Sequence, residues 1–320
     1  MRDGRRWPVV DDVSLTVARG EIVGLVGESG SGKSMTARTI VRLLPEQARS
    51  TGTILLAGTD LLRLSSRALR SVRAERVAMI FQDPRAHIDP LWTVADHLTE
   101  GLRAHKGLSR GASRRRAAEL LADVGIADVH RVLAAYPSQL SGGMLQRVMI
   151  AGALAGEPEL IIADEPTTAL DVTIQAEIVA IFDALRRERG TAMLFITHDL
   201  ELAAAICDRV VVLYAGRVVE EQETRQLFAG PLHPYTAGLL KARPRIDARL
   251  GRLAVIPGRP PTPAEAPPGC PFHPRCAFAR DFCRSGRPPL RILAPGTATA
   301  CLRTEEIRDQ LAPDLVATLD

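Results

Sequence analysis

The segment Gly27–Ser34, GESGSGKS, combines glycines, a lysine and a hydroxyl in a pattern that binds phosphate groups. It follows a short apolar run, Ile22–Val26, and precedes a helix-like pattern that stops at Pro45. In that setting successive backbone N–H groups converge on phosphate oxygens, and the helix N-terminus adds partial positive charge. Lys33 is expected to reach the β- and γ-phosphates, and Ser34 to ligate Mg²⁺. The residues predicted to bind ATP are Gly27, Glu28, Ser29, Gly30, Ser31, Gly32, Lys33, Ser34 and Thr36.

A second segment, LIIADEP at residues 160–166, is an apolar strand pattern that ends in two acids. Asp164 is suited to holding Mg²⁺ through water, and Glu165 to polarising the attacking water or taking its proton. Alone, two such acids would equally fit a solvated loop, but parallel sheets bind ligands at their carboxyl ends. Gln82 and His198 also follow apolar strand patterns, which favours an amide near Mg²⁺ and a histidine near the γ-phosphate. The predicted catalytic residues are Lys33, Gln82, Glu165 and His198, and the predicted Mg²⁺ ligands are Ser34, Gln82 and Asp164.

A third feature is the turn Ser141-Gly142-Gly143, which precedes the helix-compatible run MLQRVMIAGALAG. Small residues at a helix N-terminus form an anion-binding site. The same residues also fit a plain helix cap, because serine is a good N-cap. The turn alone leaves both interpretations open, and the neighbouring nucleotide motifs favour anion binding.

The bulk composition excludes several classes of protein. With 41 basic and 37 acidic residues, the net charge of +4 is too small to indicate nucleic-acid binding. No run of about 18 apolar residues predicts a membrane span. The first twelve residues lack the apolar stretch of a signal peptide, so we expect a cytosolic chain.

The order of these patterns predicts an α/β fold around a mainly parallel sheet. Residues 1–83 and about 156–235 would form its core. Residues 84–155 lack strand patterning and predict a helical insert that carries the Ser-Gly-Gly turn. Its Arg114–Arg116 run is interpreted as a solvated helix face. Residues 236–320 are expected to form a separate C-terminal extension rich in proline and cysteine.

Four cysteines gather in that extension: Cys270, Cys276, Cys283 and Cys301. Their gaps of five, six and seventeen residues contain no CxxC pair, which zinc sites usually show. An iron–sulfur cluster, here of the 4Fe-4S type, is therefore favoured over zinc and over unmetallated or redox-active thiols, with His273 as a possible replacement ligand. Cys207 lies in an apolar run and is expected to be a core residue.

Together these segments resemble the ATP-binding-cassette ATPases, whose core is a P-loop NTPase (RecA-like) fold. In that resemblance LSGGMLQR is the signature sequence, Gln82 the Q-loop glutamine, Ala169–Asp171 the D-loop and His198 the switch histidine. The family pairs two cassettes head to tail, so that each ATP lies between one phosphate loop and the other cassette's signature. The resemblance implies that four signature residues contact the partner's ATP: Ser141, Gly142, Gly143 and Met144. It also assigns Asp171 to the D-loop.

A narrower resemblance, to the dipeptide/oligopeptide and nickel importer ATPases, is carried by FQDPRAHIDPLWTV, ADEPTTALDVTIQ, HPYTAGLL and the cysteine tail. It implies an ATPase subunit at the cytoplasmic face of a bacterial plasma membrane. Its implied partners are two permease subunits, an extracytoplasmic substrate-binding protein and a second cassette, a paralogue or an identical chain. Leu145 departs from the pattern, since the narrower family usually has arginine there.

Three other functions remain open from the sequence. One is a soluble, non-transport cassette ATPase, which would require a coiled-coil insert or a second cassette that this chain lacks. Another is import of nickel or another small solute. A third is a regulatory module whose cysteine tail senses iron or redox state.

Overall fold

The computed structural model describes residues 7–168, 170–242 and 255–312. Contacts divide the chain into two compact units. We call the one with residues 1–16, 23–36 and 197–320 the phosphate-loop unit. The other, with residues 17–22 and 37–196, is the signature unit. The C-terminal third therefore belongs to the same unit as the phosphate loop, and the expected domain boundary at residue 235 stays a prediction.

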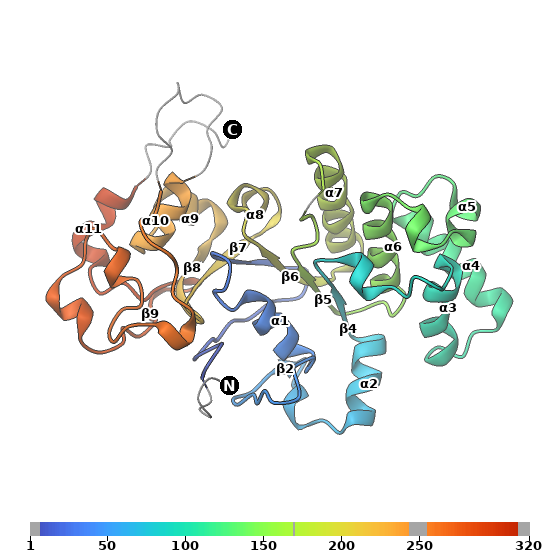
Figure 1. Ribbon diagram of the computed structural model, residues 1–320, viewed down its shortest axis with the longest axis horizontal. Helices are drawn as coiled ribbons and strands as arrows, with labels where there is room; N and C mark the ends of the chain where they lie inside the picture. The colour runs from blue at the N-terminus through green and yellow to red at the C-terminus, as the bar shows by residue number, and fades with distance from the viewer. Residues whose placement is uncertain (1–6, 169, 243–254, 313–320) are drawn as a thin grey trace. The chain divides into compact units, whose positions relative to one another are not determined.

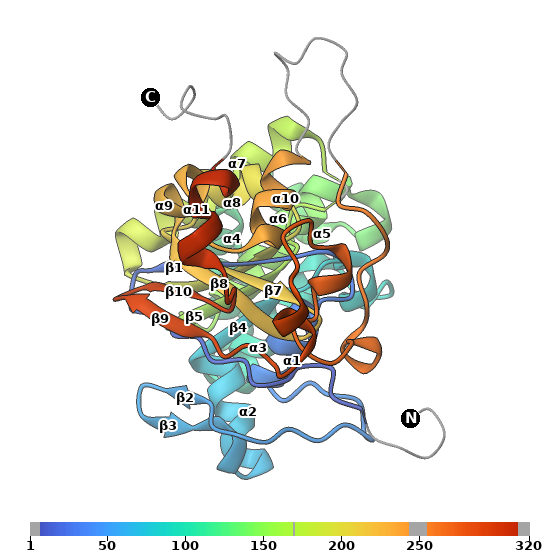
Figure 2. The same cartoon turned by 90° about the vertical axis from the view of Figure 1, so that its left-hand side faces the viewer.

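The strands of the phosphate-loop unit begin with β1 (Ile22–Val26), which is buried along its whole length and pairs parallel with β7 (Arg209–Tyr214). β7 continues antiparallel into β8 (Arg217–Glu223). Two strands of the extension, β10 (Thr297–Thr299) and β9 (Arg291–Ala294), then add antiparallel to β8, as Figure 2 shows. The extension thus continues the sheet of this unit.

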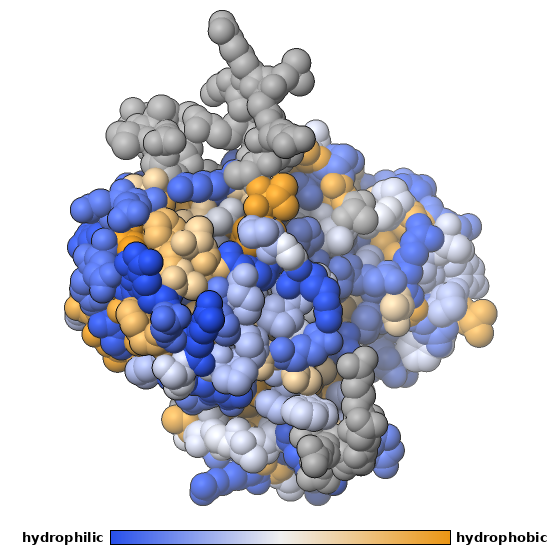
Figure 3. Space-filling view, turned by 60° about the vertical axis from the view of Figure 1, so that its left-hand side comes forward, coloured by the Kyte–Doolittle hydropathy of each residue, from blue (hydrophilic) through white to orange (hydrophobic). Residues whose placement is uncertain are grey.

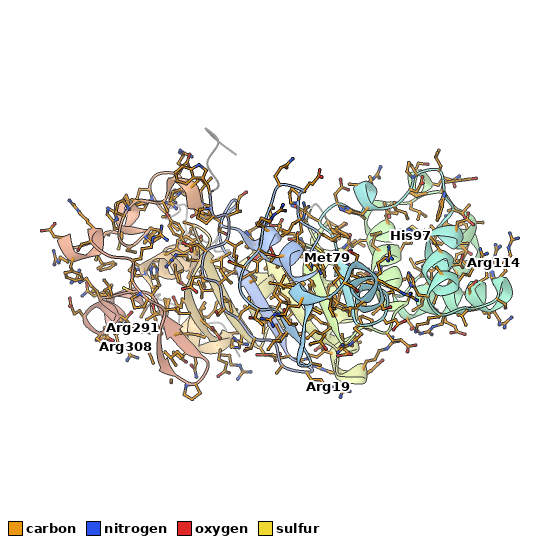
Figure 4. The ribbon with its side chains drawn as sticks, turned by 90° about the horizontal axis from the view of Figure 1, so that it is seen from below. Arg19, Met79, His97, Arg114, Arg291 and Arg308 are labelled. Atoms are coloured by element: carbon orange, nitrogen blue, oxygen red, sulfur yellow. The ribbon has the colours of Figure 1, made fainter. Side chains whose placement is uncertain are left out.

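Four helices complete this unit: α8 (Leu200–Ile206), α9 (Thr224–Ala229), α10 (Pro234–Lys241) and α11 (Thr304–Leu311). Figures 1 and 2 show α9, α10 and α11 on the same side of strands β8 to β10. β9 is tied to α11 because Arg291 donates to Glu305 at 2.9 Å. Arg291 and Arg308 are labelled in Figure 4. Short 3-10 turns at Pro263–Glu265, His273–Arg275 and Asp281–Arg284 shape the cysteine segment between α10 and β9.

The signature unit contains the parallel strands β4 (Val77–Ile80), β5 (Leu160–Asp164) and β6 (Ala192–Thr197), whose last residue passes into the other unit. The runs of buried residues in β5 and β6 are typical of parallel strands covered on both faces. A small hairpin joins β2 (Leu55–Leu56) to β3 (Thr59–Asp60). The predicted α/β fold with a mainly parallel sheet is confirmed.

The helices of the signature unit are α2 (Ser66–Glu75), α3 (Val94–Ala104), α4 (Arg110–Asp123), α5 (Val129–Ala134), α6 (Gly142–Leu154) and α7 (Val172–Arg189). Helices α3 to α6 pack against one another, on the right of Figure 1. All of residues 84–155 are described, and they contain helices and turns without a strand, as expected for the helical insert. Arg114 points outward from α4 in Figure 4 and is exposed, so the solvated-face interpretation of that arginine holds.

The surface carries no large continuous apolar area on the face drawn in Figure 3, where hydrophobic side chains lie in small patches among hydrophilic ones. Large exposed patches mark interaction sites more often than scattered apolar residues do.

Candidate nucleotide-binding site

The phosphate loop connects β1 to α1 (Lys33–Ile40), and its shape depends on glycine. Gly27 has a φ of +152°, and a Cβ there would lie 2.2 Å from the carbonyl oxygen of Leu213. Gly30 has a φ of +80°, and a Cβ there would meet nothing within 4 Å. The loop is therefore held tightly at its base and is open at its tip, where a ligand would enter.

The side chains of the loop converge on its inside. Lys33 is 5% exposed, and its Nζ donates to the carbonyls of Gly27 at 2.7 Å and Glu28 at 3.2 Å. The Ser31 hydroxyl is 3% exposed and finds no hydrogen-bond partner among the described residues. A buried hydroxyl without a partner is costly, and a phosphate oxygen would satisfy it. A cradle of this kind fits ATP.

The remaining predicted ATP-binding residues divide by exposure. The Thr36 hydroxyl donates to the Gly32 carbonyl at 3.0 Å, so it supports the loop from within α1. Ser34 is half-buried in the first turn of that helix, where a Mg²⁺ ligand would stand. Among the others, Ser29 and Gly30 are exposed, Glu28 and Gly32 are half-buried, and Gly27, Ser31, Lys33 and Thr36 are buried.

Sequence reasoning missed the contacts that hold Glu28. Its backbone N–H donates to the Tyr235 hydroxyl at 2.8 Å. Its carboxylate accepts two hydrogen bonds from the Arg275 guanidinium, at 2.7 and 3.0 Å. The partners lie 207 and 247 residues away along the chain, so no local pattern announces them. The only sequence signal was that Arg275 stands between two of the tail cysteines.

The signature unit brings Gln82 and Glu165 together, as the sequence predicts. Gln82 Nε2 donates to Glu165 Oε2 at 2.8 Å, and the Thr168 hydroxyl donates to the same oxygen at 3.0 Å. Asp164 is 2% exposed at the end of β5, directly before Glu165. Glu165 has a φ of +49°, a strained conformation for a residue other than glycine. Such strain gathers at functional sites, and here it lies at the predicted catalytic carboxylate.

The Ser-Gly-Gly turn is a helix cap in this structure. Ser141 is the N-cap of α6, and its hydroxyl accepts the Met144 N–H at 3.3 Å. Gly143 is also required for packing, because a Cβ there would lie 2.9 Å from Cγ2 of Ile174 on α7. Asp171 caps α7 in turn by accepting the Ile174 N–H at 2.9 Å. The structure therefore realises the capping interpretation, and a second role in anion binding stays a prediction.

Three further positions singled out by the sequence differ in their surroundings. Leu145, which stands where arginine was expected, is fully buried in α6 and serves as a core residue. His198 is exposed at the end of β6, next to Asp199, which caps α8. Ala169 of the D-loop lies outside the described residues. Lys33, Ser34 and His198 thus belong to the phosphate-loop unit, and Gln82, Asp164, Glu165, Ser141 and Asp171 to the signature unit.

The four tail cysteines line one small cavity, together with His233, His273 and Phe272. Burial raises the pKa of Cys270 to about 12 and that of Cys276 to about 11. Within the described part of the chain, no group of three or more His, Cys, Asp or Glu side chains could hold a metal ion. The four thiols thus gather at one pocket, but the described side chains do not support the expected iron–sulfur or zinc site, which stays a proposal.

The isolated cysteine behaves as predicted. Cys207 is 7% exposed, and its sulfur would lie 2.9 Å from a Cβ on Gly24 of β1. Burial raises its pKa well above the ordinary range, which makes the thiol unreactive. Cys207 is a core residue.

No helix in the described ranges is long and apolar enough to cross a bilayer. Two large apolar side chains follow Gln82 on the surface, however: Leu91 is 82% exposed and Trp92 is 37% exposed. They mark the segment before α3 as unusual for a protein surface.

Comparison with known proteins gives the family. Residues 10–168 match the ABC transporter family, and residues 219–283 match the oligopeptide/dipeptide transporter C-terminal region. The chain is 45% identical to the oligopeptide transport ATP-binding protein OppD of Salmonella typhimurium, over 93% of this chain and 88% of that protein. It is 49% identical to a probable peptide ABC transporter ATP-binding protein of Sinorhizobium fredii, over 92% and 89%.

A solved structure agrees with this assignment. The chain is similar to the dimeric ATP-binding cassette MJ0796 in a post-hydrolysis state with ADP and Pi, with a TM-score of 0.62 and 31% identity, over 68% of this chain and 91% of that one. The structure of this chain contains a phosphate loop, a Gln82–Glu165 contact and a capped Ser-Gly-Gly turn. The chain therefore belongs to the ATP-binding subunits of the ABC transporter family, as an ATPase with the oligopeptide/dipeptide type of C-terminal region.

Proposed function

We propose that this chain is the ATP-hydrolysing subunit of a peptide importer. The observation that carries the proposal is the phosphate loop, with buried Lys33 and unpartnered Ser31 turned into a cradle of the right chemistry. Its relatives named for peptide transport cover nearly the whole chain, including the C-terminal region.

In the proposed reaction each half of the site has a separate task. Lys33 and the loop N–H groups would hold the β- and γ-phosphates, and Ser34, Asp164 and Gln82 would hold Mg²⁺. Mg²⁺ supplies positive charge that offsets the charge developing on the transferred phosphoryl group. Glu165 orients the attacking water and accepts its proton.

Two neighbouring side chains would adjust this step. Gln82 already donates to the Glu165 carboxylate, which places its amide beside the water that Glu165 would orient. His198 is proposed to donate to the γ-phosphate as the bond to the leaving group lengthens. Its exposure leaves it accessible to a bound nucleotide.

We also propose that ATP is shared between two cassettes. Ser141, Gly142, Gly143 and Met144 would contact the ATP on the partner's phosphate loop, with Asp171 nearby in the D-loop. The start of α6 supports this, because Ser141 and Gly142 are exposed and a helix N-terminus of this kind attracts anions. The partner cassette is a paralogue or an identical chain.

The remaining partners follow from the transporter assignment. We propose two permease subunits, fed by an extracytoplasmic substrate-binding protein, with this chain bound peripherally at the cytoplasmic face of a bacterial plasma membrane. The exposed Leu91 and Trp92, just after Gln82, offer the permease an apolar contact. Contact there would couple the conformation of the nucleotide site to that of the permease.

Reconstitution tests the transport proposal. The chain and its permease partners would be placed in lipid vesicles, with the binding protein, and ATP-dependent uptake of labelled di- and oligopeptides measured against labelled Ni²⁺. We expect peptide uptake that disappears with Glu165→Gln. Uptake of Ni²⁺ alone would replace peptide by metal as cargo. ATP hydrolysis with no permease association would favour the soluble ATPase.

For the tail cysteines we propose an iron–sulfur cluster of the 4Fe-4S type, with zinc as the alternative. The support is that all four thiols line one cavity in an otherwise cysteine-poor chain. Protein purified anaerobically should be brown and contain iron and sulfide. Colourless protein with one zinc per chain would replace the cluster by zinc, and metal-free protein would overturn both.

A further inference from the structure

Arg275 joins the cysteine segment to the phosphate loop. It stands directly before Cys276, and its guanidinium makes a two-pronged ion pair with the Glu28 carboxylate, at 2.7 and 3.0 Å. The Arg275 side chain is only 6% exposed and that of Glu28 is 24% exposed. Paired, largely buried charges with two parallel hydrogen bonds are among the stronger polar contacts in proteins.

The guanidinium is also fixed from its other side. Nε donates to the Pro257 carbonyl at 2.8 Å, and Nη2 donates to the Gly258 carbonyl at 3.3 Å. Nη1 donates to the Tyr214 hydroxyl at 3.4 Å. The planar donors of arginine are thus used in several directions, and lysine could not reproduce them. Arg275 is held in place whether or not Glu28 moves.

A second anchor reaches the same loop residue. Buried Tyr235 accepts the Glu28 N–H, and its ring lies 4.5 Å from that of Tyr214 and 5.4 Å from that of Phe272, between centroids. Phe272 lines the cysteine cavity. One aromatic block therefore touches the phosphate loop at one end and the cysteine cavity at the other.

The negative charge of Glu28 makes its ion pair with Arg275 relevant to ligand binding. Glu28 is the one acidic residue in Gly27–Ser34, a loop whose ligand carries several negative charges. In a partly buried site an uncompensated carboxylate would repel phosphate strongly, because the local dielectric is lower than that of water. Arg275 reduces that repulsion by pairing with the Glu28 carboxylate.

We propose that Arg275 is a positioning residue of the phosphate loop, through which the conformation of the four-cysteine segment and the affinity for ATP are coupled. The inference rests on the proposed function only in that the loop binds ATP. Coupling of this kind is reciprocal: if the segment sets the loop, ATP on the loop must stabilise the segment. Two measurements follow, one on each end.

The first measurement is the affinity of the full chain for ATP by calorimetric titration. Arg275→Met keeps the apolar stem and removes the charge. We expect ATP binding to weaken roughly tenfold or more, because the Glu28 carboxylate is left uncompensated in the loop that would bind the phosphates. Removing that carboxylate as well, in the double variant with Glu28→Gln, should restore affinity to within about threefold of Glu28→Gln alone.

A matched control is Arg303→Met. Arg303 is also an inward arginine of the extension, since it donates to the Phe278 carbonyl and to Glu306, but no contact joins it to the loop in the described chain. It should leave ATP affinity unchanged. If the double variant binds ATP as weakly as Arg275→Met, or if Arg275→Met binds normally, the electrostatic role is wrong. Failure of the wild type to bind ATP would instead overturn the proposed function, and this inference with it.

The second measurement is hydrogen–deuterium exchange of residues 270–276, with and without ATP. Their amides include Cys270 N–H, bonded to the Cys283 carbonyl at 2.8 Å, and Arg275 N–H, bonded to the Phe272 carbonyl at 2.9 Å. ATP should slow their exchange severalfold in the wild type and in Arg303→Met, but not in Arg275→Met at saturating ATP. Exchange that ignores ATP in the wild type would show that the two ends are not coupled.

Discussion

The phosphate loop and the four-cysteine segment are both irregular stretches rich in special residues, yet they differ in how complete their chemistry is. In the loop, buried Lys33 donates to two loop carbonyls, and the buried Ser31 hydroxyl has no partner among the described residues, so a cradle for phosphate is in place. In the cysteine segment, four thiols line a cavity without a metal-holding arrangement in the described chain. The relative positions of residues that are adjacent in sequence are set by the local backbone. The relative positions of ligands spread over a long segment depend on how the whole segment packs.

The two regions are also physically linked, because Arg275 and Tyr235 both form hydrogen bonds with Glu28. The cradle is built by local geometry, but one of its residues is held by the less complete region. Perturbations can therefore be ranked by whether they act on the chemistry, on the cradle or on its support.

The largest effect is expected at the chemistry itself. Glu165→Gln keeps the size of the side chain but removes the proton acceptor, so kcat for ATP hydrolysis should fall on the order of 10²–10⁴-fold. ATP affinity should change little, because Glu165 is not part of the phosphate cradle. Steady-state turnover and equilibrium binding would be measured together. Normal turnover in this variant would remove Glu165 from the reaction.

Lys33→Ala tests how much Lys33 contributes to ATP binding in the cradle. Loss of charged hydrogen bonds to phosphate should weaken ATP binding by roughly 10- to 100-fold. Lys241→Ala is the matched control, since Lys241 is exposed at the end of α10 and away from the loop in sequence. Equal affinities in the two variants would contradict the assignment of Lys33.

Gly27→Ala addresses the backbone geometry of the cradle. A Cβ at Gly27 would lie 2.2 Å from the Leu213 carbonyl oxygen, at a φ that alanine avoids, so stability should drop on the order of 1–3 kcal/mol or more. Gly30→Ala meets open space and should cost less. Denaturant unfolding would compare them. Equal losses would mean that strain in φ, rather than crowding at the base, sets the cost.

The last effect depends on pH and concerns Glu220 on β8, where the extension joins the sheet through β10. Complete burial raises its pKa from 4.5 to about 7, although Leu232, His233 and Gln222 donate hydrogen bonds to its carboxyl group. Folding favours the protonated form, so this contribution to stability is full below about pH 4.5 and is lost as the pH rises through about 7.

The free energy of unfolding of the wild type should therefore fall between these pH values by a few kcal/mol at most, and Glu220→Gln should remove that part of the slope. Thermal or denaturant unfolding at several pH values provides the measurement. An unchanged slope in the variant would show that Glu220 does not govern it.

Much of the site could be predicted from the sequence. The loop was found because its glycines and Lys33 are contiguous. Gln82 and Glu165 were found because each follows an apolar strand pattern, and neighbouring parallel strands end at the same edge. Thr168 was missed, although it lies only three residues from Glu165, because hydroxyl orientation depends on the turn.

What the sequence could not show lies in long-range contacts. The Arg275–Glu28 pair spans 247 positions, and nothing near either residue specifies the other. The strands β9 and β10 are short, and Ile292 on β9 is 80% exposed, so no buried alternation marks them as part of the sheet. The number of tail cysteines predicted a shared ligand, but their spacing does not determine whether the four sulfurs converge.

The shared ATP site is tested most directly by the ATP-dependent association of Glu165→Gln chains, alone or with a paralogous cassette, in analytical ultracentrifugation. Without nucleotide the chains should be monomeric, and with ATP they should pair. Adding Ser141→Arg should abolish pairing, whereas Ser109→Arg, at the equivalent N-cap of α4, should not. Pairing that survives Ser141→Arg, or no pairing at saturating ATP with either partner, would contradict an ATP held between one cassette's phosphate loop and the other's signature turn.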